Sequence, residues 1–143
     1  MRTDLIYLVQ TNTTIGFLSQ NLQKLNKIKN RPPNKKFLKV VSDFSSLPRV
    51  PKKFKKRVRK TPNNNTYVIK NEAYRVITEP HHREFLKKFK WMYSSSANES
   101  GKNFDEEFAT KNADVLVIDK RGYFESEPSK IYKLSKNKIK RLR

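Results

Sequence analysis

The sequence lacks cysteine altogether among its 143 residues. Disulfide bonds, thiolate metal sites and cysteine nucleophiles are therefore excluded together. Histidine is almost as scarce, since the only two, His81 and His82, are adjacent. Neighbouring side chains diverge on a helix or a strand, so these two cannot form a two-histidine metal site by themselves. We expect no metal centre built from protein ligands.

Long hydrophobic runs are also missing. No apolar stretch approaches the roughly 18 to 20 residues that cross a bilayer, and the N-terminus has none of the zones of a signal peptide. Only 35% of the residues are hydrophobic and the mean hydropathy is -0.88. Short apolar runs nevertheless recur at intervals suited to strands, which argues against global disorder. We expect one soluble, cytoplasmic domain with no membrane partner.

Acidic residues are few: 33 lysines and arginines outnumber 13 acids, which gives a net charge of +20 and a pI near 10.3. Such a charge attracts polyanions. It is densest at Pro51–Lys60, where seven of ten residues are cationic and Phe54 and Val58 are spaced i, i+4. This pattern predicts a short basic helix, or a mobile arm, that binds tRNA or another structured RNA; a solvated surface is the alternative. The expected RNA-binding residues are Lys52, Lys53, Lys55, Lys56, Arg57, Arg59 and Lys60.

Apolar periodicity predicts the order of strands and helices. We expect strands at residues 4–10, 37–41, 66–70, 73–77, 114–118, 130–134 and 138–142, and helices at 19–29, 80–90 and 103–110. Ser19 is the expected N-cap of the first helix. The strands at 66–70 and 73–77 should form an antiparallel hairpin, and 114–118 should be buried. This order indicates an α/β fold with a twisted, mixed parallel and antiparallel sheet and flanking helices.

Three polar clusters follow or precede apolar strands, where open α/β sheets bind their ligands. They are Thr11–Gly16, Lys29–Arg31 and Ser94–Gly101. Each has an ordinary structural explanation as well. The first is compatible with a simple turn, the second with cations that stabilise a helix C-terminus, and the third with a serine-rich surface loop. We expect the three to converge on one concave face.

In this order the clusters resemble the YrdC-like family, whose enzymes make threonylcarbamoyl-adenylate from ATP, L-threonine and bicarbonate. The resemblance spans nearly the whole chain and implies a single YrdC-like domain over residues 1–143. The Ser94–Gly101 run is the most specific match. The matching residues are Gln10–Phe17, then Lys29, Arg31, Pro32, Asn34 and Lys35, then Ser94–Gly101, Ala113–Asp114 and Pro128–Lys130.

The resemblance also implies roles for individual residues. The family's catalytic tetrad falls on Lys29, Arg31, Ser96 and Asn98, whose side chains suit phosphates and carboxylates. The nucleotide, carried with Mg²⁺, would contact Ser94 and Ser129 as well as the tetrad. Threonine or its carbamate would contact Thr11, Thr14, Arg75 and His82, with His81 as the alternative histidine.

The implied function is L-threonylcarbamoyladenylate synthase, a nucleotidyltransferase that serves tRNA modification with ATP, L-threonine, tRNA and other threonylcarbamoylation proteins as its partners. Three positions depart from the family pattern, namely Asn12, Ile15 and Lys130. These departures favour the alternative, a non-catalytic relative that binds double-stranded RNA or tRNA.

Overall fold

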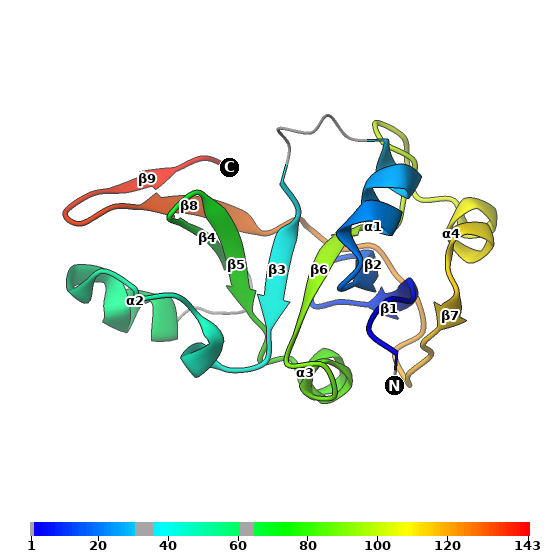
Figure 1. Cartoon of the computed structure of the whole chain (residues 1–143), viewed down its shortest axis with the longest axis horizontal. Coiled ribbons are helices and arrows are strands. Elements are labelled where there is room, and N and C mark those ends of the chain that lie inside the picture. The colour runs from blue at the N-terminus through cyan, green and yellow to red at the C-terminus, as the bar shows by residue number, and fades with distance from the viewer. Residues whose placement is uncertain (1, 31–35, 61–64) are drawn as a thin grey trace.

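Nine strands form one sheet in the part of the chain that the computed structural model describes, which is residues 2–30, 36–60 and 65–143 (Figure 1). The strands are β1 Tyr7–Gln10, β2 Ile15–Ser19, β3 Leu38–Val41, β4 Asn65–Ile69, β5 Glu72–Val76, β6 Trp91–Ser96, β7 Val115–Leu116, β8 Lys130–Leu134 and β9 Ile139–Arg141. Their order is β7-β1-β2-β6-β3-β5-β4-β8-β9. The pairs β1–β7, β3–β5 and β4–β8 are parallel and the others antiparallel, so the predicted mixed sheet is confirmed.

Four helices of the described residues flank this sheet. They are α1 Leu22–Lys29, α2 Lys55–Lys60, α3 Pro80–Lys87 and α4 Glu106–Asn112, with short 3-10 turns η1 at Phe44–Ser46 and η2 at Lys52–Phe54. Within the described ranges, no helix combines the length and the apolar character that crossing a bilayer requires. The order of helices and strands matches the α/β arrangement expected from the sequence.

Strand β1 is buried on both faces because its alternating side chains enter two separate clusters. Tyr7 and Val9 pack with Phe85 and Leu86 of α3, and Tyr7 also makes an edge contact with the Phe85 ring at 5.4 Å between centroids. Leu8 lies in the cluster on the other side, together with residues of α1 and α4. This double cover fixes the strand that leads into the predicted polar loop.

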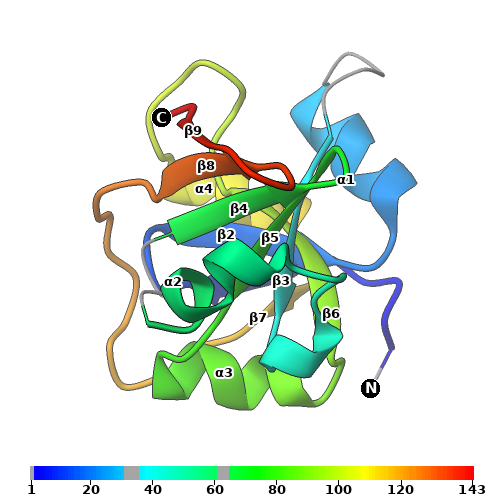
Figure 2. The same ribbon diagram turned by 90° about the vertical axis from the view of Figure 1, so that its left-hand side faces the viewer.

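The opposite end of the sheet has a third cluster beneath helix α2. Phe54 and Val58 pack there on Tyr67, Ile69 and Leu134, so the predicted short helix with one apolar face is confirmed. Helix α2 and the β8–β9 hairpin lie together at this end, and α4 and β7 at the other (Figure 1). Figure 2 views the molecule from this end, with α2 in front of the strands and α3 below.

The expected N-cap at Ser19 is wrong. Ser19 is the last residue of β2, a strand that the sequence analysis assigned to loop and helix. Its hydroxyl accepts a hydrogen bond from Asn21 N at 2.9 Å, and the true cap is Asn21, whose Oδ1 accepts from Lys24 N at 3.1 Å. Strand β2 was not predicted because its side chains are buried on both faces of the sheet and show no period-2 alternation: Leu18 lies in the cluster with α3, and Ile15 and Phe17 lie in the cluster with α1 and α4.

Other boundaries also moved. The expected buried strand at 114–118 is wrong in extent, since β7 contains only two residues and the Ile118 side chain is 73% exposed. A two-residue edge strand pairs with one neighbour only, and its outer side faces solvent. Strand β6 runs to Ser96 because it pairs with β2 up to Gly16. Helix α4 begins after Asp105, which caps it by accepting from Glu107 N at 3.0 Å.

Candidate functional site

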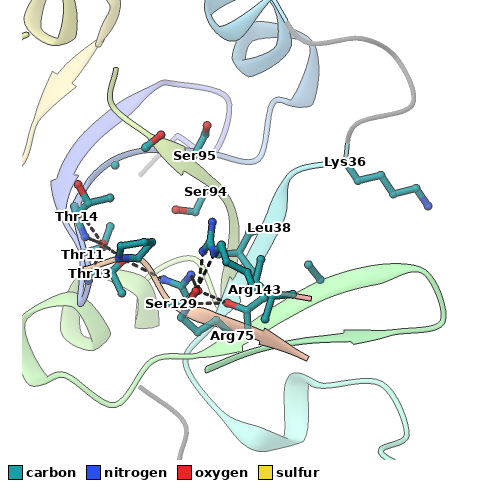
Figure 3. A pocket seen from close by; sticks show the side chains of 16 residues that line it. Thr11, Thr13, Thr14, Lys36, Leu38, Arg75, Ser94, Ser95, Ser129 and Arg143 are labelled. Carbon is teal, nitrogen blue, oxygen red and sulfur yellow. Dashed lines mark hydrogen bonds between the residues drawn. The ribbon is translucent and has the colours of Figure 1, made fainter. Parts of the chain in front are cut away.

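A cleft of about 330 Å³ lies over the middle strands of the sheet (Figure 3). Two of the predicted clusters meet in it, because β2 pairs with β6 and places Thr11–Gly16 beside Ser94–Ser96. Strands β3, β4 and β5 and the segment before β8 complete the lining. The labelled lining residues in Figure 3 are Thr11, Thr13, Thr14, Lys36, Leu38, Arg75, Ser94, Ser95, Ser129 and Arg143.

Arg75 forms the floor of this cleft. Its side chain extends from β5 and is only 7% exposed. The guanidinium donates to three hydroxyls, which are Thr66 Oγ1 at 3.0 Å, Thr13 Oγ1 at 3.2 Å and Ser129 Oγ at 2.6 Å, and to the amide oxygen Asn12 Oδ1 at 3.4 Å. Burial, and to a smaller degree the charge of Arg143, lowers the pKa of Arg75 to about 10, so that it stays charged at neutral pH.

Arg143 adds a second cation beside Arg75. Its Nε donates to Ser129 O at 2.9 Å and its Nη2 to Ser129 Oγ at 3.3 Å, so both guanidinium groups share one serine (Figure 3). Lys36 also lines the cleft, whereas no acidic side chain of the described residues does. Buried charges are normally paired. A buried cation whose hydrogen bonds go to neutral hydroxyl and amide oxygens is therefore suited to an anionic ligand.

The turn between β1 and β2 forms one wall and is internally braced. Thr11 Oγ1 accepts from Thr13 N at 3.2 Å and from Thr14 N at 3.1 Å, and it donates to Thr14 O. Gly16 permits close packing here, because a Cβ at that position would lie 3.0 Å from Thr11 Cγ2 and 3.2 Å from Ser95 O. The backbone is thus held where its hydroxyls face the cleft.

Arg121 supports this turn from behind, a role that the sequence did not predict. Its guanidinium donates to Gln10 O at 2.9 Å and to Thr11 O at 3.3 Å. It also forms ion pairs with Asp119 at 2.8 Å and with Glu79 at 3.2 Å. Glu79 in turn accepts from the first backbone N–H groups of α3. One arginine therefore ties the wall of the cleft to the start of a helix.

Three of the four tetrad residues come together at the edge of the cleft. Lys29 is buried, and its Nζ donates to Ser96 O at 2.9 Å, Asn98 O at 2.5 Å and Asn98 Oδ1 at 3.3 Å. Ser100 Oγ closes the arrangement by donating to Lys29 O at 2.5 Å. As observed, Lys29 orders the serine-rich segment, and Ser96 is the member that lines the cleft. Arg31, the fourth member, lies outside the described residues, as do Pro32, Asn34 and Lys35.

Neither histidine lines the cleft. His82 is fully buried, and neither ring nitrogen has a hydrogen-bond partner among the described residues. Burial, followed by the charges of Arg75 and Arg121, lowers the pKa of His82 to about 3, so its ring is neutral. His81 is exposed and pairs with Glu79 Oε1 at 2.8 Å. The expected contact of His82 with substrate stays a prediction.

A site for a metal held by protein side chains was not expected, and the described residues contain no group of three or more histidine, cysteine, aspartate or glutamate side chains that could bind one.

Comparison with known proteins identifies a family model, a curated relative and solved structures that match this chain. The family model Sua5_yciO_yrdC, described as "Telomere recombination", matches residues 2–143. A curated relative from Mycoplasma pneumoniae, "Uncharacterized protein MG259 homolog", is 28% identical over 142 residues, which cover 94% of this chain. This chain spans only 31% of that relative's length.

Solved structures share the fold at low identity. The P. abyssi Sua5 structure in complex with L-threonine matches with a TM-score of 0.80 and 14% identity, covering 97% of this chain and 50% of that one. E. coli YciO matches with a TM-score of 0.80 and 17% identity, covering 98% and 82%. HypF from a phosphate- and nucleotide-bound structure matches with a TM-score of 0.75 and 14% identity, covering 97% and 26%.

Proposed function

The chain belongs to the Sua5/YciO/YrdC family, and from this membership and the cleft we propose that it makes threonylcarbamoyl-adenylate from ATP, L-threonine and bicarbonate. The family includes threonylcarbamoyl-AMP synthases. The product would serve tRNA threonylcarbamoyladenosine modification in the cytoplasm, with tRNA and further threonylcarbamoylation proteins as partners. The P. abyssi Sua5 relative binds L-threonine, which supports the choice of amino acid.

One observation carries the proposal: Arg75 is a buried cation held by neutral hydroxyls and the Asn12 amide oxygen in a cleft that no described acidic residue lines. Its partners fix the guanidinium before a ligand arrives, so little order has to be created on binding. A carboxylate or a phosphate can accept charge-assisted hydrogen bonds from it. L-Threonine supplies the former and ATP the latter.

In the proposed reaction the threonine amine and bicarbonate form a carbamate and release water. A carbamate oxygen then attacks the α-phosphorus of ATP, and the bond from that phosphorus to the bridging oxygen breaks, so that pyrophosphate leaves with the electron pair. Mg²⁺ bound to the triphosphate would neutralise part of its charge. The protein's contribution is to orient the two ligands and to stabilise the negative charge on the oxygens of the α-phosphate in the transition state.

We propose roles for individual residues as follows. Arg75 would hold the threonine carboxylate, and Thr11 and Thr14 would face its amine or carbamate. Ser94, Ser96 and Ser129 would contact the phosphates, since all three line the cleft. Lys29 and Asn98 would set the position of Ser96 through the hydrogen bonds that join them, with Arg31 as a further phosphate ligand.

The test is pyrophosphate release by the purified protein, with each substrate omitted in turn. We expect release from ATP only when L-threonine and bicarbonate are both present, and threonylcarbamoyl-adenylate as the product in mass spectra. Omission of either substrate should reduce the signal to background. Release that ignores threonine would mean a different nucleotide chemistry.

The second candidate is the non-catalytic relative that binds double-stranded RNA or tRNA. The observation that favours it is the exposure of all seven cations of Lys52–Lys60 on η2 and α2. Under this alternative the protein would bind RNA but release no pyrophosphate under any combination of substrates.

A further inference from the structure

A second hollow, separate from the cleft, opens at the end of the molecule where α2 and the β8–β9 hairpin lie. We call it the basic groove; its volume is about 770 Å³. Three chain segments line it: Arg49–Lys53 before and within η2, Ile69–Lys70 at the β4–β5 turn, and Leu134–Asn137 at the β8–β9 turn. Because the segments are distant in sequence, only the fold brings their side chains together.

Five cations surround this groove, contributed by all three segments. They are Arg49, Lys52, Lys53, Lys70 and Lys136, and all are exposed. No acidic side chain within the described ranges lines the groove, and none of the five cations forms an ion pair there. Lys53 Nζ reaches across to Asn137 O at 3.5 Å. The local field is therefore of one sign and uncompensated.

The backbone at Lys70 is a second, independent observation. Lys70 and Asn71 have φ values of 52° and 67°, the left-handed conformation that a tight two-residue hairpin turn needs. Asparagine tolerates it, but for lysine it costs on the order of 1 kcal/mol. Strained residues tend to gather at functional sites. Lys70 therefore brings a cation to the groove at a turn position where asparagine or glycine is the usual residue.

The chemistry of the groove favours a phosphate backbone over a protein partner. Protein interfaces depend on apolar or aromatic anchors that fill pockets. Three apolar residues line this groove: Ile69 and Leu134 are already buried in the α2 cluster, and Pro51 is half-buried before η2. None of the exposed large hydrophobic side chains of the described chain lines it. Nucleic-acid interfaces depend instead on cations that neutralise phosphates.

We propose that the basic groove binds the phosphate backbone of structured RNA, with Lys52, Lys53, Lys70 and Lys136 neutralising successive phosphates. The inference takes the class of partner from the proposed function and adds the site, at the opposite end of the sheet from the α4 and β7 edge. It separates the RNA contact from the nucleotide chemistry. Recognition is of charge and shape, and sequence has little influence.

The experiment is a titration of an RNA duplex of about 20 base pairs into the full chain, at several salt concentrations from roughly 50 to 200 mM. The groove variant replaces Lys52, Lys53, Lys70 and Lys136 with Gln. A matched variant replaces Lys27, Lys87, Lys88 and Lys111, which are exposed elsewhere, and so loses the same net charge. Circular dichroism and thermal unfolding check that both variants fold.

We expect the slope of log affinity against log salt to flatten by about 3 in the groove variant, since each lost phosphate contact removes about 0.7 to 0.9. The matched variant should change it by less than about 1. Equal slopes in the two variants would overturn the groove and leave the RNA partnership standing. Failure of the wild-type protein to bind RNA, or binding of polyglutamate in its place, would overturn both. Pyrophosphate release by the groove variant reports on the cleft separately.

Discussion

The cleft and the basic groove are both cationic and free of acidic lining residues within the described chain, yet their cations are held in opposite ways. In the cleft, Arg75 is buried and fixed by three hydroxyls. In the groove, the lysines are exposed and solvated. Hydrogen bonds fix the direction of the one buried charge, whereas the groove cations are exposed and, among the described residues, only Lys53 of this set donates a hydrogen bond across the groove, to Asn137 O.

This difference teaches what each site can select. A guanidinium fixed before binding favours ligands whose oxygens lie at matching positions, as those of an amino acid or a nucleotide can. Exposed lysines can bind any closely spaced phosphates, and salt screens their attraction to them. The cleft should therefore respond to substitution and pH, and the groove to ionic strength.

The largest expected effect is in the cleft. Arg75→Gln removes the buried cation while Thr66 and Ser129 can still bond each other at 2.8 Å, so the fold should persist. Loss of a desolvated charge contact should cost about 2 to 4 kcal/mol of L-threonine binding, measured calorimetrically beside an ATP analogue. Arg83→Gln, which removes a surface pair with Asp43, is the control and should bind normally. Equal affinities in the two variants would contradict the cleft assignment.

The next effect is a dependence of the free energy of unfolding on pH, caused by the buried ring of His82. Folding lowers the pKa of His82 to about 3, so below its ordinary value of about 6.5 the unfolded chain gains a proton that the folded chain does not. Stability should fall as pH drops from about 6.5 towards 3, by up to about 1.4 kcal/mol per unit. The measurement is the free energy of unfolding in denaturant at pH 7 and about pH 4.5, where the expected His82 contribution is about 2 to 3 kcal/mol.

Two variants isolate this contribution from the carboxylates, which also titrate. His82→Leu should lose less stability on acidification than the wild type by that amount. His81→Gln, at the exposed neighbouring histidine, should keep the wild-type decline. A His82→Leu decline as steep as the wild type would show that the buried ring is not the source.

A smaller effect tests how tightly the cleft wall is built. Gly16→Ala places a methyl group 3.0 Å from Thr11 Cγ2 and 3.2 Å from Ser95 O, and overpacking of this kind costs about 1 to 3 kcal/mol of stability. Threonine affinity should fall as the wall shifts. Gly122→Ala strains a residue at φ 69° with open space around it, so it should destabilise the fold and spare the affinity. Loss of affinity in both would point to general unfolding.

The smallest effect is in the groove, where the substitution should raise the free energy of unfolding and not lower it. Lys70→Gly relieves a left-handed lysine and should raise the free energy of unfolding by about 0.5 to 1 kcal/mol. The same change should flatten the RNA salt slope by about one phosphate contact, or 0.7 to 0.9. Lys70→Gln keeps the strain and loses the charge, so it should flatten the slope without the gain in stability. A slope unchanged in both would remove Lys70 from the RNA contact.

Local patterns were sufficient for most of the fold. Phe54 and Val58 at i, i+4 predicted the apolar face that η2 and α2 pack on the sheet, and apolar periodicity predicted the helix at 80–90 that corresponds to α3. Strand β2 was not predictable in this way, because its burial depends on pairing with β1 and β6. Ser19 has the chemistry of a helix cap but lies in that strand, so the local preference lost to tertiary pairing.

In the site, too, local sequence patterns predicted some features, whereas others depend on tertiary packing. The proximity of Thr11–Gly16 to Ser94–Ser96 was predictable from polar clusters at strand ends. Arg121, by contrast, bonds Gln10 O across 111 residues, and no nearby pattern marks it. In the groove, Lys70 and Lys136 sit in turns outside the dense basic segment, and only the packing of three turns brings them beside Lys52 and Lys53.

A crystal structure of the protein grown with L-threonine and a non-hydrolysable ATP analogue tests the central claim most directly. The account predicts the threonine carboxylate within hydrogen-bond distance of Arg75 and the phosphates against Ser94, Ser96 and Ser129. The contrary result is an unoccupied cleft with either ligand bound in the basic groove, or a threonine carboxylate that contacts neither Arg75 nor Arg143.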